Sequence, residues 1–138
     1  MQNMSAGKTA LGLDNNIGAL ICYVGNVVCA LGLIYSIVVL VTDKTNKLPR
    51  FHAMQSILLT ATSIVLYIAA VIVSMVIFAI GAALNSSLFG ILSMLVYLVV
   101  LVIGIGLFVF MVISAIKAFQ GEVYKIPVIG NFADKFSN

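Results

Sequence analysis

Two long tracts without a charged residue dominate this sequence, residues 15–42 and residues 53–116. A membrane-spanning helix needs about 20 mostly apolar residues. The second tract, which is 64 residues long, can therefore hold two spans, and the first can hold one. Apolar residues make up 63% of the chain and charged residues only 8%, whereas roughly a quarter of the residues of a soluble domain are charged. Such a composition cannot cover a water-facing surface, so we expect an integral membrane protein.

The expected fold is all-α: a polytopic helical membrane protein with three transmembrane helices and a short interfacial segment near the C-terminus. We predict a single transmembrane domain over residues 1–138, with spans at about 17–41, 53–84 and 88–116. We expect no cleavable signal peptide, because the first apolar run is too long for a signal core and only Lys8 precedes it.

The first apolar run allows two interpretations, because Gly25 and Asn26 interrupt it. One is a single tilted or kinked span, which we favour. The other is a short entering helix at roughly 13–24 followed by a second piece at 27–42, which makes the run re-entrant. The run is too short for two full spans, since each needs about 20 residues.

Local signals set the ends of the other helices. Pro49 disfavours a helical conformation at Leu48 and suits the opening of the next helix, so we expect the second helix at about 51–84. Residues 85–87, Asn-Ser-Ser, predict a tight turn, and the third helix then extends from about 88 to 119. Gly121 is a natural helix stop.

Charge predicts the topology. Lys and Arg concentrate in cytoplasmic loops, and here they gather in the loop at 43–50 and in the tail at 120–138. Two spans separate these segments, so both lie on one side, which we expect to be the cytoplasmic side of a prokaryotic inner membrane. The N-terminus is then outside with three spans, and inside if the first run is re-entrant. Phe132 and Phe136, one helical turn apart, would share a face that can lie on the membrane surface.

A polar group at the start of the second span is the candidate functional site. Arg50, His52 and Gln55 lie where the chain enters the membrane, and polar groups there need partners because lipid offers none. The partners that we expect are tail residues on the same side: Glu122, Tyr124 and Lys125. The main interpretation is a polar network that pins the tail to the loop. The alternative is an interface with a partner protein or lipid headgroup.

A second candidate is a stripe of small residues at every fourth position of the first run: Gly18, Cys22, Asn26 and Ala30. Such a stripe lets another helix approach closely, within one chain or between chains. Asn26 would hydrogen-bond across a helix interface or, as the less favoured alternative, line a pore. Cys22 and Cys29 are about 10 Å apart along a helix, which is too far for a disulfide bond.

No reactive constellation is visible in the sequence. The chain has a single histidine and none of its four acids lies inside a predicted span, so we do not expect an enzyme, although His52 alone could act as a base. We expect no cofactor, no metal site and no nucleic-acid binding. The hypothesis is a non-enzymatic accessory or scaffold subunit whose partners are the bilayer and either another membrane protein or further copies of the chain. The alternative is a small oligomeric channel, transporter or translocation component.

Two motifs suggest a family. The first is Arg50-Phe51-His52-Ala53-Met54-Gln55-Ser56, preceded by Asp43-Lys44 and Asn46. The second consists of Lys117 to Glu122, then Tyr124 to Pro127, then Ile129-Gly130. Together they resemble small prokaryotic membrane proteins with a domain of unknown function, related to the twenty-kilodalton import component of the chloroplast inner envelope (Tic twenty-like).

This resemblance covers roughly residues 13–136. It implies that the loop and the tail share the inner side of the membrane. It also implies a link to protein translocation for the plastid relatives, which carry four spans, one more than predicted here. Some bacterial relatives are in specialised organelle membranes and influence mineral growth.

Overall fold

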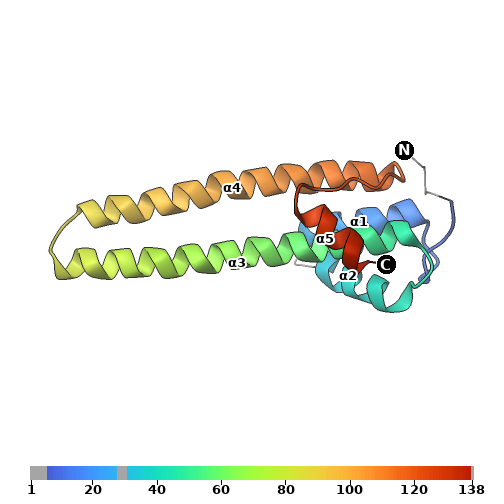
Figure 1. The fold of residues 1–138 in the computed structure, drawn as a ribbon, viewed down its shortest axis with the longest axis horizontal. Coiled ribbons are helices and arrows are strands. Elements are labelled where there is room, and N and C mark those ends of the chain that lie inside the picture. The colour runs from blue at the N-terminus through green and yellow to red at the C-terminus, as the bar shows by residue number, and fades with distance from the viewer. Residues whose placement is uncertain (1–5, 28–30, 138) are drawn as a thin grey trace. The chain divides into compact units, whose positions relative to one another are not determined.

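The computed structural model describes residues 6–27 and 31–137. Within them the chain forms five helices, which are shown in Figure 1: α1 (Asn15–Val27), α2 (Leu31–Thr42), α3 (Lys47–Ala83), α4 (Leu88–Phe119) and α5 (Ile129–Phe136). The predicted all-α fold is confirmed. The helices divide into two compact units. Unit 1 comprises residues 1–60 and 109–138, and unit 2 comprises residues 61–108.

Two helices of the described chain, α3 and α4, are long and apolar enough to cross a membrane. They contain 37 and 32 residues, which corresponds to roughly 55 and 48 Å at 1.5 Å per residue. At most 17% of the most apolar stretch of either helix is buried, whereas the core helix of a soluble protein would be mostly buried. In the described residues, the first of the three predicted spans, at about 17–41, contains no such helix.

The expectation of a single helix over the first apolar run is wrong. That run forms two separate helices, α1 and α2, which pack against each other. They are antiparallel, because the backbones of Gly25 and Gly32 touch near one end, while Tyr35 reaches Gly18 toward the other. With 13 and 12 residues, each helix is only about 18–20 Å long, well short of the roughly 30 Å of a hydrocarbon core.

Glycine makes this antiparallel pair possible. A Cβ on Gly32 would lie 2.5 Å from the backbone nitrogen of Asn26 and 2.7 Å from the carbonyl oxygen of Cys22. A Cβ on Gly25 would lie 2.7 Å from the Cα of Gly32. Backbone atoms cannot move aside as a flexible side chain can, so only glycine fits at this crossing.

The C-terminal ends of the long helices follow the sequence signals. Asn85 (φ 49°) ends α3 and Gly121 (φ 74°) ends α4 in the left-handed conformation. In both cases the next residue donates its backbone N–H to a carbonyl five residues back, from Ser86 to Gly81 and from Glu122 to Lys117. This pattern is the Schellman motif, which satisfies carbonyls left free at a helix end.

The start of α3 differs from the prediction. The helix begins at Lys47 rather than near Phe51, so Leu48 is helical although Pro49 follows it. Pro49 is tolerated because it occupies the first turn of the helix, where backbone N–H groups have no partner within the helix.

The interior of unit 1 consists of two small apolar clusters. One is formed by Ala19, Tyr23, Leu48, Ala115 and Ala118, which come from α1, α3 and α4. The other is formed by Cys22, Val39 and Ala53, which come from α1, α2 and α3. Helix α1 therefore lies against segments that are far apart in the sequence. Asn16 adds a polar contact by donating from Nδ2 to the carbonyl of Phe119 at 3.2 Å, at the end of α4.

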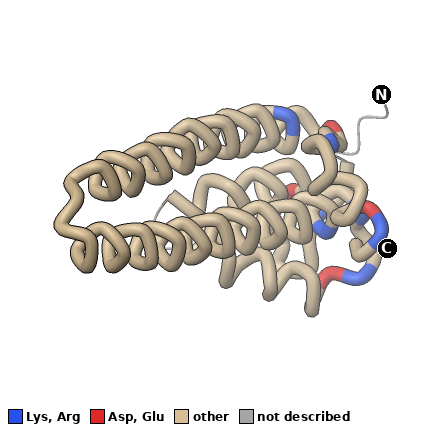
Figure 2. The backbone as a smooth tube through the Cα atoms, turned by 60° about the vertical axis from the view of Figure 1, so that its left-hand side comes forward, with Lys and Arg blue, Asp and Glu red and all other residues tan. Residues whose placement is uncertain are grey.

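Unit 2 contains only the parts of α3 and α4 within residues 61–108 and the turn between them. The two segments run antiparallel (Figure 1) and meet at Ser93, whose hydroxyl donates to the carbonyl of Ser74 at 3.3 Å. Unit 2 has no charged residue, so all the charges of the chain belong to unit 1, as Figure 2 shows.

Candidate functional site

The polar residues near the start of α3 are buried rather than displayed. His52, Gln55 and Ser56 are all fully buried in unit 1. They lie at positions i, i+3 and i+4 and therefore share one face of the helix. A buried polar group without a partner destabilises the fold by about 1–3 kcal/mol, so each of these side chains requires hydrogen bonds.

His52 connects α1 to the tail. Its Nε2 lies 3.0 Å from the carbonyl oxygen of Glu122, and its Nδ1 lies 3.0 Å from the hydroxyl of Tyr23. A carbonyl can only accept, so Nε2 carries the proton and Nδ1 accepts from the Tyr23 hydroxyl. This arrangement fits a neutral imidazole with both nitrogens engaged.

Gln55 holds the same tail segment with its amide group. Its Oε1 accepts from the backbone N–H of Ile126 at 3.2 Å, and its Nε2 donates to the carbonyl of Tyr124 at 3.1 Å. The Nε2 also contacts the hydroxyls of Tyr23 (3.0 Å) and Ser114 (3.2 Å). The side chain thus pairs with alternate residues of an extended segment as a neighbouring strand would.

Arg50 links three parts of the chain. Its Nη1 donates to the carbonyls of Leu40 (3.1 Å) and Asp43 (2.8 Å) at the end of α2, and its Nε donates to the carbonyl of Ser137 at 2.9 Å. A cation suits a helix C-terminus, where carbonyls are left unpaired. Arg50 therefore closes α2 and holds the end of the tail with one guanidinium.

The structure brings the tail residues to this site through their backbone and not through the side chains that the sequence suggested. The side chain of Glu122 forms an ion pair with Lys117 at 2.9 Å, and that of Lys125 forms one with Asp134 at 2.8 Å. Tyr124 contributes its carbonyl. The physical reason is that the segment from Gly121 to Pro127 is neither helix nor sheet, so its backbone groups need outside partners.

Sequence reasoning missed the role of Asp43, which is only 2% exposed. Its Oδ1 accepts from the backbone N–H of Asn46 at 3.2 Å, and its Oδ2 accepts from that of Ala10 at 3.3 Å. Asn46 in turn donates to the carbonyl of Lys8 at 2.9 Å. Short polar residues directly before a helix are a known capping signal, which could have identified Asp43 and Asn46.

The small-residue stripe of α1 packs within the chain. Asn26 donates from Nδ2 to the hydroxyls of Ser56 (2.8 Å) and Thr60 (3.2 Å) on α3. Cys22 packs against Val39 and Ala53, and Gly18 leaves space for Tyr35. Ala30, the fourth member of the stripe, and Cys29 lie outside the described residues.

The charged groups near the tail are arranged in pairs. In the described chain, no three His, Cys, Asp or Glu residues are close enough together to hold a metal ion. The ammonium of Lys125, which is hydrogen-bonded to Asp134, holds the pKa of that carboxyl below its usual range. Lys47 also approaches Asp134, at 4.0 Å. The arrangement can fix a tail in place.

Comparison with known proteins places the chain in a family. Residues 14–133 match the magnetosome magnetite crystal formation protein family. The chain belongs to this family.

The chain is also similar to two membrane proteins of the archaeon Methanocaldococcus jannaschii. One, UPF0132 membrane protein MJ1443, is 30% identical over 95% of this chain and 96% of its own length. The other, UPF0132 membrane protein MJ1527, is 29% identical over 92% of this chain and 73% of its own length. No solved structure matches the chain significantly.

These matches correct one expectation from the sequence. The suggested relationship to the chloroplast import component is wrong, because the matching proteins belong to the magnetosome family and to the archaeal UPF0132 membrane proteins. The two motifs quoted for that resemblance are the segments that build the buried polar site, with Arg50, His52 and Gln55 in the first motif and residues 122–126 in the second.

Proposed function

We propose that this chain is a non-enzymatic subunit of a prokaryotic cell membrane and that unit 1 acts as a cytoplasmic platform for a partner. The observation that carries the proposal is the use made of the polar residues. The hydrogen bonds of these residues join the start of α3 to the tail, since His52, Gln55 and Arg50 bond to backbone groups of residues 122–137. A catalytic group must be within reach of a substrate, whereas these groups are occupied by backbone and buried hydroxyls.

The proposed topology has two spans, formed by α3 and α4. The α1–α2 pair enters from the cytoplasmic side and returns to it, since helices of 10–14 apolar residues suit a re-entrant segment. The location of all charges in unit 1, with Lys and Arg in excess, supports a position for this unit at the cytoplasmic face of the membrane. The N-terminal segment and the tail then lie on the same side.

The family is named for magnetite crystal formation, but the acids of this chain do not favour direct contact with a mineral. Asp43 is buried, and Glu122 and Asp134 are paired with lysines. Asp14 is exposed, but in the described part of the chain no three His, Cys, Asp or Glu residues lie close enough together to share a metal ion. A surface that binds iron would need several unpaired oxygen ligands close together. We therefore propose that the chain acts on proteins of its membrane, as a scaffold.

Affinity purification from gently solubilised membranes tests the platform. The full chain should recover a defined protein partner or further copies of itself. Gln55→Leu, which frees residues 124–126, should reduce that recovery, whereas Ser93→Ala, in unit 2, should not. A wild-type chain that purifies as a monomer without a partner would contradict the proposal.

Cysteine labelling tests the topology independently. In a chain with Cys22 and Cys29 replaced by alanine, single cysteines at positions 47 and 125 should react with an impermeant reagent from the same side of the membrane. Labelling from opposite sides would remove the proposed two-span topology and the platform with it.

An oligomeric channel or transporter is a second candidate, favoured by the open glycines of α4. A Cβ added at Gly90, Gly104 or Gly106 would meet nothing within 4 Å, so another copy of the chain can approach closely there. Liposomes containing the protein should then show a flux of small solutes, which the bulky substitution Gly104→Leu should reduce. Absence of flux at every lipid composition tested would eliminate this candidate.

A further inference from the structure

Helix α5 exposes an apolar stripe on one flank. Its members are Val128 just before the helix, Phe132 and Phe136, which are 69%, 52% and 56% exposed. Residues four apart differ by about 40° around a helix, so Phe132 and Phe136 share one side of α5, and Val128 lies just before the helix. Val128 is held at φ 67°, a strained conformation for a β-branched residue. Such strain persists only where the surrounding structure fixes it.

The opposite flank of α5 is fixed to unit 1. Gly130 and Ala133 are buried, and a Cβ on Gly130 would lie 2.6 Å from the Cα of Lys125. The pair between Lys125 and Asp134 and the bond from Arg50 to the carbonyl of Ser137 hold both ends of this contact. The orientation of the apolar stripe is therefore set by the fold.

A third sector of α5 is polar and exposed. It contains Asn131 and Lys135, which lie about 100° and 60° from Phe132 on the side away from Phe136, at 100° per residue. The helix thus has three sectors: one packed against unit 1, one that is apolar and exposed, and one that is polar and exposed. The ammonium of Lys135 lies 5.8 Å from the centre of the Phe136 ring, between the polar and apolar sectors.

We propose that α5 is an in-plane membrane anchor, with Val128, Phe132 and Phe136 inserted at the boundary between phospholipid headgroups and acyl chains. This inference rests on the proposed topology. Asp134 lies 4.0 Å from Lys47, and the carbonyl of Ser137 accepts a hydrogen bond from Arg50. Helix α5 is therefore level with the first turn of α3, directly before the charge-free tract begins. Phospholipid is present at this level of every membrane protein.

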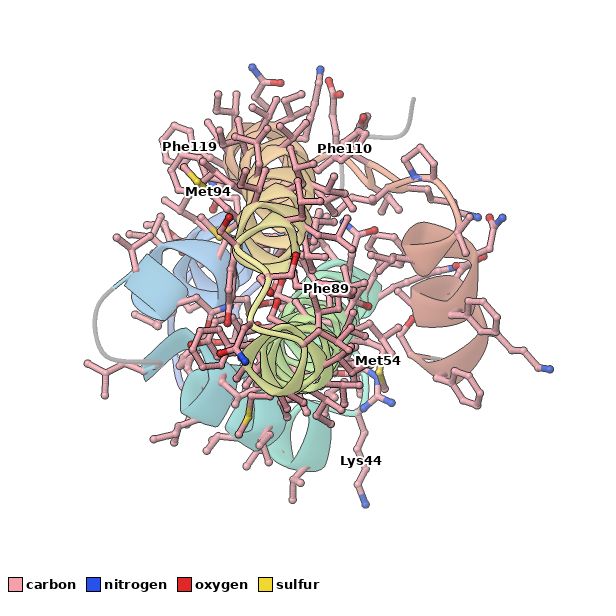
Figure 3. All side chains as sticks on the ribbon, turned by 90° about the vertical axis from the view of Figure 1, so that its left-hand side faces the viewer. Lys44, Met54, Phe89, Met94, Phe110 and Phe119 are labelled. Atoms are coloured by element: carbon pink, nitrogen blue, oxygen red, sulfur yellow. The ribbon has the colours of Figure 1, made fainter. Side chains whose placement is uncertain are left out.

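Charge favours a lipid surface as the occupant. The ammonium of Lys135 lies over the ring of Phe136, beside the apolar stripe. Lys44, in the loop before α3, extends into open space in Figure 3. Basic residues on the polar side of an apolar sector are typical of helices that lie in the interface, where the apolar side sinks about 5–10 Å and cations meet phosphate groups. The anchor would fix the tail against the leaflet from outside while Gln55 and Arg50 fix it from within.

Tryptophan fluorescence tests the anchor, because the chain has no tryptophan of its own. Phe132→Trp is placed in the full chain, which is reconstituted into vesicles of phosphatidylcholine and phosphatidylglycerol. Brominated phospholipid should quench its emission about twofold or more, with a depth profile centred about 5–10 Å below the headgroups. Asn131→Trp, on the polar sector, should instead be quenched by acrylamide from the water.

A third reporter separates this proposal from the topology. Phe108→Trp replaces an exposed residue of α4 in unit 2, and brominated lipid should quench its emission if α4 spans the membrane.

If acrylamide quenches Phe132→Trp as strongly as Asn131→Trp while Phe108→Trp responds to lipid, the anchor is wrong and the topology stands. Emission from Phe132→Trp that is shielded from both quenchers indicates a protein occupant and also overturns the anchor. If Phe108→Trp does not respond to lipid, the spanning topology fails, and the anchor that rests on it fails too.

Discussion

The two units of this chain are stabilised in opposite ways. In unit 1, buried polar side chains close on backbone groups, as Gln55 does with Tyr124 and Ile126. In unit 2, two helix segments without charge expose most of their large apolar side chains, and the Ser93 hydroxyl donates to the Ser74 carbonyl between them. Buried hydrogen bonds hold the segments of unit 1 in one arrangement. Helices that expose apolar side chains are instead stable only where the surrounding solvent is itself apolar, as lipid is. The difference assigns specific structure to unit 1 and an apolar surface suited to lipid to unit 2.

Glycine substitutions should show the largest contrast. In unit 1, Gly32→Ala places a Cβ within 2.7 Å of two backbone atoms of α1, so we expect it to destabilise the fold by about 1–3 kcal/mol or more. In unit 2, Gly104→Ala meets nothing within 4 Å and should have no destabilising effect. Thermal unfolding in detergent, followed by circular dichroism, compares the two. Equal losses in both variants would remove the contrast between the units.

Polar substitutions should give an intermediate contrast. Gln55→Leu leaves the Ile126 N–H and the Tyr124 carbonyl unpaired in the interior, at a cost of about 1–3 kcal/mol each. Ser93→Ala removes one hydrogen bond from unit 2 and should cost only about 0.6 kcal/mol. Limited proteolysis should also cut the tail of the Gln55→Leu variant faster, with Ser93→Ala as the control. A tail that stays protected without Gln55 would show that this amide does not hold it.

Acid should produce the smallest effect, and only through unit 1. The pKa of Asp134 is lowered by Lys125, so its contribution to stability is complete above the unfolded-state pKa of about 3.9. That contribution is lost as the pH falls through the lower folded-state value. Asp134→Asn should therefore lower stability slightly at pH 6 and should flatten the loss of stability below about pH 4. Identical acid profiles for the variant and the wild type would show that the pair is energetically silent.

Helix ends were predictable from the sequence where the signal is local. The α4 bounds, 88 to 119, agree with the structure, because the turn at Asn85 and the stop at Gly121 depend on the backbone preferences of those residues. The start of α3 was misplaced because Pro49 is compatible with a first helical turn as well as with a break. The α1–α2 pair was only an alternative, since it depends on the contact of Gly25 with Gly32, and hydropathy does not report such contacts.

The candidate site was predictable in membership but not in chemistry. The sequence placed Arg50, His52 and Gln55 beside the tail, because polar residues at a membrane boundary need partners. It assigned those partners to side chains of the tail, whereas the structure uses carbonyl and N–H groups, which every residue carries and no sequence pattern distinguishes. Tyr23 and Ser114 were missed for a related reason. Their hydroxyls lie in apolar runs, where they read as ordinary helix residues until the fold shows what they face.

The bond between Gln55 and Ile126 joins residues 71 positions apart, and this separation determines the order in which the protein can be completed. The tail is synthesised after both long helices, so the bonds of Gln55 to Tyr124 and Ile126 can form only after those helices have been made, whereas its partners Tyr23 and Ser114 precede the tail. Every chain therefore passes through an intermediate in which the helices exist and unit 1 is still open. Quality-control proteases that survey nascent membrane proteins would have their best opportunity at that stage, and docking of the tail would end it.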